Sequence, residues 1–148
     1  MNRKNYIFLF FLLISISLCA KDIETFSPDK KILVRTTVSE KVSLQVLYEE
    51  NQLFEIRDIR METDRGDIPV ANPHIQKIKT RTVNGTVVPV IKEKQASIPE
   101  NYNETTIEFR ENCKLLIRAY NEGVAYRIVS TLPGEMTVRN EHAEFVTD

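Results

Sequence analysis

Four oxygen-bearing side chains lie close together just before an apolar stretch of the chain: Glu100, Asn101, Asn103 and Glu104. Carboxylate and amide oxygens are the ligands that calcium prefers, and two carboxylates that flank a sugar linkage can hydrolyse it. The group lacks the D-x-[DN]-x-[DN]-G spacing of a calcium loop, however. Because these residue types also favour turns, we interpret the group as turn chemistry ahead of a strand at Thr105 to Phe109.

Histidine and cysteine offer little more chemistry. His74 and His142 are the only histidines, and neither lies in a metal-binding spacing such as H-x-x-x-H. Cys113 stands between Asn112 and Lys114 at the start of an apolar run, where we expect a buried and unreactive thiol. The sequence therefore assigns no catalytic, cofactor-binding or metal-binding residue.

Two arginines, Arg118 and Arg127, lie on neighbouring apolar runs and could together hold a carboxylate. Arginines on a solvated sheet face more often form structural pairs with nearby acids. We therefore expect both residues to pair with carboxylates such as that of Glu108.

Aromatic residues do not suggest a sugar-binding platform. The chain has no tryptophan, although carbohydrate-binding sandwiches usually present flat aromatic side chains. Tyr102, Tyr120 and Tyr126 fall within or beside predicted strands, where packing would use them.

Most of the chain alternates between apolar and polar residues, as in the run Val42, Leu44 and Val46, which is the period of a half-buried strand. No segment sustains a helical stripe. Further strands are predicted at Ile32 to Val38, Leu53 to Met61 with a break near Asp58, Ile75 to Val83, Thr86 to Ile91, Thr105 to Phe109, Lys114 to Tyr120, Gly123 to Ser130, Glu135 to Arg139 and Glu141 to Thr147.

Turn residues separate these runs. Ser27-Pro28-Asp29-Lys30 predicts a type I turn, and Asn84-Gly85 predicts a two-residue hairpin. Asn121-Glu122-Gly123 predicts a three-residue hairpin with Gly123 in the left-handed region. Asp64 to Ile75 is polar and contains Gly and Pro, so we expect a long excursion between strands. About nine short strands with these turns predict an all-β fold, an antiparallel β-sandwich.

The N-terminus has the order of a secretory signal peptide. Asn2-Arg3-Lys4 precedes an uncharged, mostly apolar run that ends at Ala20. A membrane anchor would need about 20 apolar residues, more than this run supplies. Lipidation at Cys19 is less favoured, because Leu18 is bulky where that site usually has a small residue. We expect a signal peptide over residues 1–20 and a secreted or periplasmic protein.

Cleavage after Ala20 would leave one domain, Lys21 to Asp148, of 128 residues. Cys113 would then be its only cysteine, so no internal disulfide could form and stability would come from the core. Loss of Arg3 and Lys4 leaves 18 basic and 21 acidic residues, a net charge of −3. This interspersed acidic excess argues against nucleic-acid binding.

Three segments bear a family resemblance: Ser27-Pro28-Asp29-Lys30, Tyr102-Asn103-Glu104, and the run from Arg118 to Arg127, RAYNEGVAYR. Together they resemble the N-terminal domain of glycoside hydrolase family 97, which includes secreted α-glucosidases and α-galactosidases of gut Bacteroidetes. The resemblance implies a β-super-sandwich that packs against a catalytic (β/α)8 barrel, followed by a small C-terminal β domain. It also implies carboxylates and calcium on that barrel. None of these catalytic residues or calcium ligands matches a residue of this chain.

The chain is therefore interpreted as a non-catalytic N-terminal module, truncated at its C-terminal end, whose partner is a catalytic barrel in the same or a separate chain. A lone sandwich offers no cleft that holds two carboxylates across a glycosidic bond. This hypothesis predicts an exposed apolar patch and an open strand edge. The alternatives are a free-standing secreted interaction protein with a polar surface and a carbohydrate-binding sandwich with exposed aromatic side chains.

Overall fold

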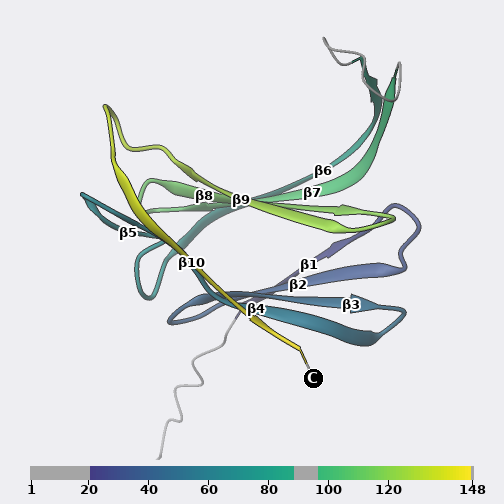
Figure 1. Cartoon of the computed structure of the whole chain (residues 1–148), viewed down its shortest axis with the longest axis horizontal. Helices are drawn as coiled ribbons and strands as arrows, with labels where there is room; N and C mark the ends of the chain where they lie inside the picture. The colour runs from purple at the N-terminus through teal and green to yellow at the C-terminus, as the bar shows by residue number, and fades with distance from the viewer. Residues whose placement is uncertain (1–20, 89–96, 148) are drawn as a thin grey trace, which may run out of the picture.

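The computed structural model describes residues 21–88 and 97–147, which form ten β-strands and no helix (Figure 1). The expectation of an all-β chain is confirmed. No helix of the described part is long and apolar enough to cross a membrane. The strands are β1 (Lys21–Phe26), β2 (Ile32–Val38), β3 (Val42–Tyr48), β4 (Asn51–Thr63), β5 (Gly66–Ile68), β6 (Ile75–Val87), β7 (Ile98–Phe109), β8 (Cys113–Tyr120), β9 (Val124–Ser130) and β10 (Val138–Val146).

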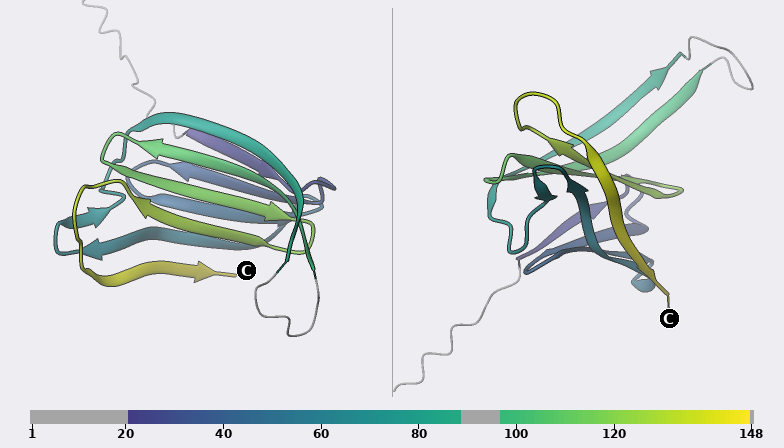
Figure 2. Two further views of the ribbon diagram at one scale, coloured as in Figure 1. Left: turned by 90° about the horizontal axis from the view of Figure 1, so that it is seen from above. Right: turned by 60° about the vertical axis from the view of Figure 1, so that its left-hand side comes forward.

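The strands make two antiparallel sheets that face one another, so the predicted β-sandwich is confirmed (Figures 1 and 2). Sheet A has the order β1-β2-β3-β4-β10, with β5 paired to the second half of β4. Sheet B has the order β6-β7-β8-β9. Among the described residues, strand β10 pairs only with β4, which leaves its outer edge open there as the sequence predicts for the last strand.

Period-two burial builds the core between the sheets. Strands β2 and β8 alternate strictly between buried and half-buried residues, because successive side chains point to opposite faces. Val34 from sheet A and Ile107, Leu115 and Ile117 from sheet B are fully buried. Each such side chain contributes about 1.5–3 kcal/mol through burial. Thr25 of β1 also donates a 2.7 Å hydrogen bond across the core to Thr105 of β7.

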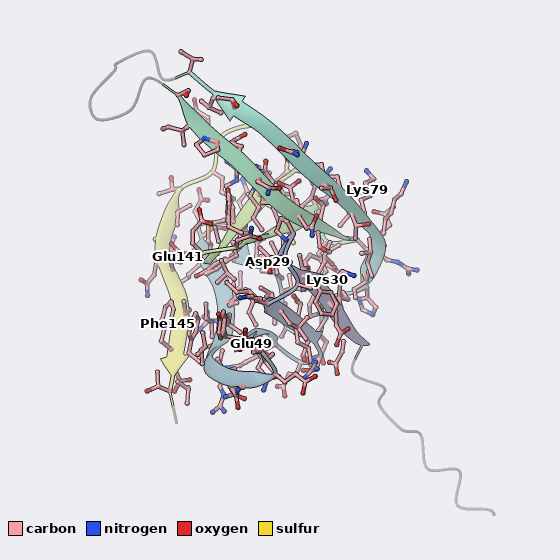
Figure 3. All side chains as sticks on the ribbon, turned by 90° about the vertical axis from the view of Figure 1, so that its right-hand side faces the viewer. Asp29, Lys30, Glu49, Lys79, Glu141 and Phe145 are labelled. Atoms are coloured by element: carbon pink, nitrogen blue, oxygen red, sulfur yellow. The ribbon has the colours of Figure 1, made fainter. Side chains whose placement is uncertain are left out.

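The three motif segments of the sequence meet at one end of the sandwich. In the turn, the Lys30 amide donates to the Ser27 carbonyl at 2.9 Å, which confirms the predicted turn (Figure 3 labels Lys30 and Asp29). The Asp29 amide then donates to Asn121 Oδ1 of the β8–β9 connection at 3.0 Å. Asn103 Nδ2 donates to the Phe26 carbonyl at 2.7 Å. These residues therefore join β1, β7 and β8, and their role here is structural.

Strands β6 and β7 extend past the rest of sheet B as a two-stranded ribbon. Their pairing runs to Val87 and Ile98, whereas β8 pairs with β7 only as far as Tyr102. We call the two-stranded part, residues 84–88 and 97–101, the arm. It bends away from sheet A, so the outer face of sheet B is concave toward the arm (Figures 1 and 2).

Several local predictions were wrong. Asn84-Gly85 does not turn the chain but lies within β6, and the strand predicted from Thr86 ends at Val87, with residues 89–91 outside the described part. The connection at residues 121–123 has the predicted length, but Gly123 does not have a positive φ. Of the two strands predicted near the C-terminus, Glu135–Arg139 belongs to β10 only at Val138 and Arg139, and Glu141–Thr147 lies in the same strand as far as Val146.

Other differences concern strand limits. Strand β1 was not predicted, and β7 begins at Ile98 rather than Thr105. The excursion from Asp64 to Ile75 contains the short strand β5. The break near Asp58 is confirmed, since this residue has a φ of 52° within a continuous β4.

Candidate functional site

The outer face of sheet B carries the most organised polar group of the described residues. Alternate residues of each strand point there, and the strand register sets Arg81, Glu104 and Arg118 side by side on β6, β7 and β8. Four residues farther along β7, Glu108 lies between Lys79 and Lys114. Two carboxylates are therefore each held between two cations.

Glu104 is the centre of the first group, although its side chain is only 4% exposed. Arg81 Nε donates to Oε1 and Arg118 Nε donates to Oε2, each at 2.7 Å. Burial alone would favour the neutral acid, but the two guanidinium hydrogen bonds prevail and lower the pKa of Glu104. The same contacts raise the pKa of Arg118. The carboxylate is thus held ionised and fully engaged.

Aromatic rings fix one of these arginines. The Arg118 guanidinium lies 4.5 Å from the centre of the Tyr102 ring, and Tyr102 packs against Tyr120 at 4.9 Å between centroids. Tyr102 is only 3% exposed as a result. Tyr126 points to the other side of sheet B and packs against the core. The expectation that packing uses these tyrosines is confirmed, and they form no exposed platform for a sugar.

Glu108 forms the second group. It accepts a hydrogen bond from Lys79 at 2.6 Å and a longer one from Lys114 at 3.3 Å. The Lys79 contact is the largest effect that lowers the pKa of Glu108. Arg118 was expected to pair with a nearby carboxylate such as this one, and a structural pair is confirmed, but with Glu104, because the register of β7 and β8 places those two residues opposite each other. Arg127 forms no ion pair with any residue that the structure describes.

These carboxylates cannot perform glycoside hydrolysis as they stand. A general acid needs a raised pKa and free access to the leaving oxygen. Glu104 and Glu108 instead have lowered pKa values and are occupied by cations. The arrangement is suited to holding cationic side chains in place on a sheet face.

The predicted oxygen cluster is dispersed by the strand. Glu100, Asn101, Asn103 and Glu104 all lie within β7, so the interpretation as a turn was wrong. Successive residues point to opposite faces, and Asn103 is bonded to Phe26 and Thr82. The described residues contain no group of three His, Cys, Asp or Glu side chains that could hold a metal ion. The family resemblance implies a calcium ion on the catalytic barrel, and these described residues offer no ligand set for it.

Histidine and cysteine lie apart from this face. His74 Nδ1 lies 2.8 Å from Glu111, and His142 Nε2 lies 3.7 Å from Glu62. Cys113 is 1% exposed, and burial raises the pKa of its thiol to about 12, so the expectation of a buried thiol is confirmed. Cys19 lies outside the described residues.

Arg81 was missed by sequence reasoning. Its alternation with Lys79 along a strand was visible, but the carboxylate that each one meets depends on how β6 aligns with β7. Glu104 was considered only as an oxygen ligand, and nothing local indicated its burial between two arginines.

Two antiparallel sheets, with Glu104 and Glu108 of the exposed face held in ion pairs, define a β-sandwich module. The chain matches the glycosyl-hydrolase 97 N-terminal family over residues 26–148 and belongs to that family. The resemblance noted in the sequence is thereby confirmed.

Two similar proteins place this module within larger enzymes. A retaining α-galactosidase of Bacteroides thetaiotaomicron is 25% identical over 129 residues, which cover 86% of this chain and 19% of that protein. Solved structures of a glycoside hydrolase family 97 enzyme from Pseudoalteromonas sp. strain K8, in complex with panose or acarbose, align with a TM-score of 0.70 at 16% identity. The structural alignment covers 85% of this chain and 20% of the enzyme's chain.

The chain thus spans about a fifth of the length of these relatives. The matched part is their N-terminal, non-catalytic domain, and their catalytic region is not covered. The structural alignment at 16% identity shows the fold alone.

Proposed function

We propose that this module packs against the catalytic (β/α)8 barrel of a secreted α-glycosidase and stabilises it. The barrel would be supplied by the same chain or by a separate one. The supporting relatives are a retaining α-galactosidase and an enzyme solved with panose and acarbose, so the proposed substrates are α-glycosides. Export to the periplasm or the medium is part of the proposal and rests on the signal-like sequence of residues 1–20.

The arm is the observation that carries the proposal. Val87, Val88 and Ile98 are 42%, 65% and 46% exposed along it. A two-stranded ribbon without a third strand or a covering layer is marginally stable in water. Exposed apolar side chains on such a ribbon are typical of a protein contact. A partner surface that covers the arm would bury these side chains.

The unpaired edge of β10 also supports packing against a partner. Strand β10 has one unpaired edge, and Phe145 on it is 65% exposed, with its ring 6.2 Å from that of Phe54 (Figure 3 labels Phe145). An exposed edge with an apolar side chain favours association with further β-structure. The free-standing alternative, which predicted a polar surface, does not account for these exposed side chains.

Calcium would belong to the barrel in this proposal. The described residues of the sandwich provide no cluster of ligands for the ion, and their best carboxylate, Glu104, is engaged by arginines. The module would therefore contribute packing surface, and the chemistry would reside in its partner.

The test is complex formation with the polypeptide encoded directly after codon 148. The chain and that polypeptide are produced together, and the complex is measured by size-exclusion chromatography and by hydrolysis of p-nitrophenyl α-galactoside and α-glucoside. We expect co-elution and activity. The paired change Val87→Glu and Ile98→Glu should abolish co-elution, whereas Leu53→Glu, an equally exposed position on sheet A at 51%, should not.

Two results would contradict the packing proposal. If the wild-type chain remains a monomer beside that polypeptide, or if neither the downstream sequence nor an adjacent gene encodes a barrel, the packing proposal fails. The free-standing interaction protein then becomes the better hypothesis.

A further inference from the structure

The concave outer face of sheet B is strongly basic, although the chain as a whole has a formal net charge of −1. Five cations surround Glu104 and Glu108 there, an excess of three positive charges over these two carboxylates, and Glu100 of the arm lies on the same side of β7. A shallow groove of about 610 Å³ runs over this face. We call the five cations the basic face: Lys79, Arg81, Lys114, Arg118 and Arg127.

The two arginines bound to Glu104 retain free donors. Both donate to the carboxylate through Nε, which leaves the terminal nitrogens of Arg81 for another acceptor, whereas Arg118 also interacts with the side chain of Tyr120 and keeps only its remaining N–H groups. Glu104 is the only carboxylate of the described residues that pairs with either one. Because the side chain of Arg118 is also held over the Tyr102 ring, ordering it on binding would cost little further entropy.

Arg127 adds an unpaired charge beside them. It is exposed on β9 opposite Leu116 of β8, lines a shallow pocket together with Arg118, and has no ion pair among the described residues. Leu116 and Val129 form an aliphatic floor between the cations of the groove. The face thus offers fixed guanidinium groups around an apolar patch, which is the composition of a protein contact.

The arm continues the same surface. Strand alternation and register place Val87 and Ile98 on the side of the sheet that carries Arg81 and Glu104. The ribbon of the arm bends away from sheet A (Figures 1 and 2), so the curved outer side of sheet B carries both the basic face and these apolar side chains.

We propose that this curved outer side docks an acidic protein surface, in which Asp or Glu side chains meet Arg81, Arg118 and Arg127 and apolar side chains meet the arm. The inference rests on the proposed function, because the partner it implies is an acidic patch of the catalytic polypeptide. Charge complementarity of this kind speeds association and fixes orientation.

A protein fits this surface better than an acidic polysaccharide does. Sugar rings bind most readily on exposed aromatic faces, and Tyr102 is buried beneath Arg118. The aliphatic floor and the apolar arm instead suit protein side chains. The family's enzymes also carry their catalytic domain in the same chain, so a protein surface lies next to this module in those relatives.

The test begins with a defined probe, poly-L-glutamate. Binding to the purified chain is measured by titration calorimetry at about 0.01 M and about 0.15 M ionic strength, with polygalacturonate as the polysaccharide comparison. Arg127→Glu avoids disturbing the buried Glu104 and should weaken poly-L-glutamate binding about tenfold or more at the lower ionic strength. Arg139→Glu makes the same charge change on the exposed part of β10 and should alter binding less than about twofold.

Three outcomes would overturn the assignment: no binding of poly-L-glutamate, equal weakening by the two arginine variants, or tighter binding of polygalacturonate. The complex with the downstream polypeptide separates this proposal from the preceding one. If that complex forms and Arg127→Glu leaves its affinity unchanged, the packing function stands and the basic face is the wrong surface. If no complex forms with any variant, the packing function fails, and the poly-L-glutamate titration alone decides whether the face binds acidic protein.

Discussion

Replacing Glu104 with glutamine tests the central ion group of sheet B most directly. The amide has nearly the same size as the carboxylate, so the change creates no cavity and leaves Tyr102 and its contacts in place. It removes the negative charge between two guanidinium groups. One end of the amide is also a donor, which would face an arginine that can only donate.

The expected loss follows from how exposed each partner is. The side chain of Arg118 is 28% exposed, and a charge-assisted hydrogen bond in such surroundings contributes about 1.5–3 kcal/mol. The side chain of Arg81 is 59% exposed, so solvent screening reduces its share to about 0–1 kcal/mol. Glu104→Gln should therefore lower the free energy of unfolding by about 1.5–4 kcal/mol.

Urea unfolding followed by far-ultraviolet circular dichroism measures this change, since the chain has no tryptophan to report on it. The pH dependence provides a second check. The pKa of Glu104 is lowered in the folded chain, so its contribution is present above the unfolded value of about 4.3 and is lost as the pH falls through the folded value. The difference between wild type and variant should be constant near pH 7 and shrink below about pH 4.

Glu100→Gln is the matched control on the same face of β7, and it should change stability by less than about 0.5 kcal/mol. The reasoning is refuted if Glu104→Gln is as mild as this control. A difference that persists undiminished below about pH 3 would also refute it, because the charge of Glu104 could not then be its source.

Three further expectations concern the core and the N-terminus. Thr36→Val should raise the free energy of unfolding by about 1 kcal/mol, because the buried Thr36 hydroxyl has no hydrogen-bond partner among the described residues. Thr25→Val should lower the free energy of unfolding by about 1–3 kcal/mol, because it removes the hydrogen bond to Thr105. Equal effects of the two changes in urea unfolding would contradict this expectation. Cys113 should resist Ellman's reagent at pH 8 in the folded chain and react in urea, since its pKa is about 12; rapid reaction of the folded chain would contradict its burial. Mass spectrometry of the exported protein should show an N-terminus at Lys21, and a lipid-modified Cys19 would refute that cleavage site.

Local sequence signals predicted the fold where burial on one face set the pattern. The alternation in β2, β3 and β8 reports which side chains face the core, so strand positions followed from it. Turn chemistry at Ser27 to Lys30 was also sufficient, because its hydrogen bonds form within the turn itself.

Local sequence signals did not predict strand limits correctly where pairing with a distant strand sets them. Asn84-Gly85 has a strong turn preference, but β6 pairs with β7 from Ile75 to Val87 and continues through it. Each added pair of strand residues contributes ladder hydrogen bonds that a turn at that point would lose. Strand β1 was missed because it contains polar residues at most positions and becomes a strand by pairing with β2.

The sequence alone determined the class of the protein: a two-sheet β module with the motifs of the glycoside hydrolase 97 N-terminal domain and no pair of catalytic carboxylates. The tertiary structure decided which charges meet. Arg81, Glu104 and Arg118 are distant along the chain, and only the register of β6, β7 and β8 brings them together on one face. A shift of one residue would turn each of these side chains to the opposite face, so the site depends on strand alignment, which composition and spacing do not encode.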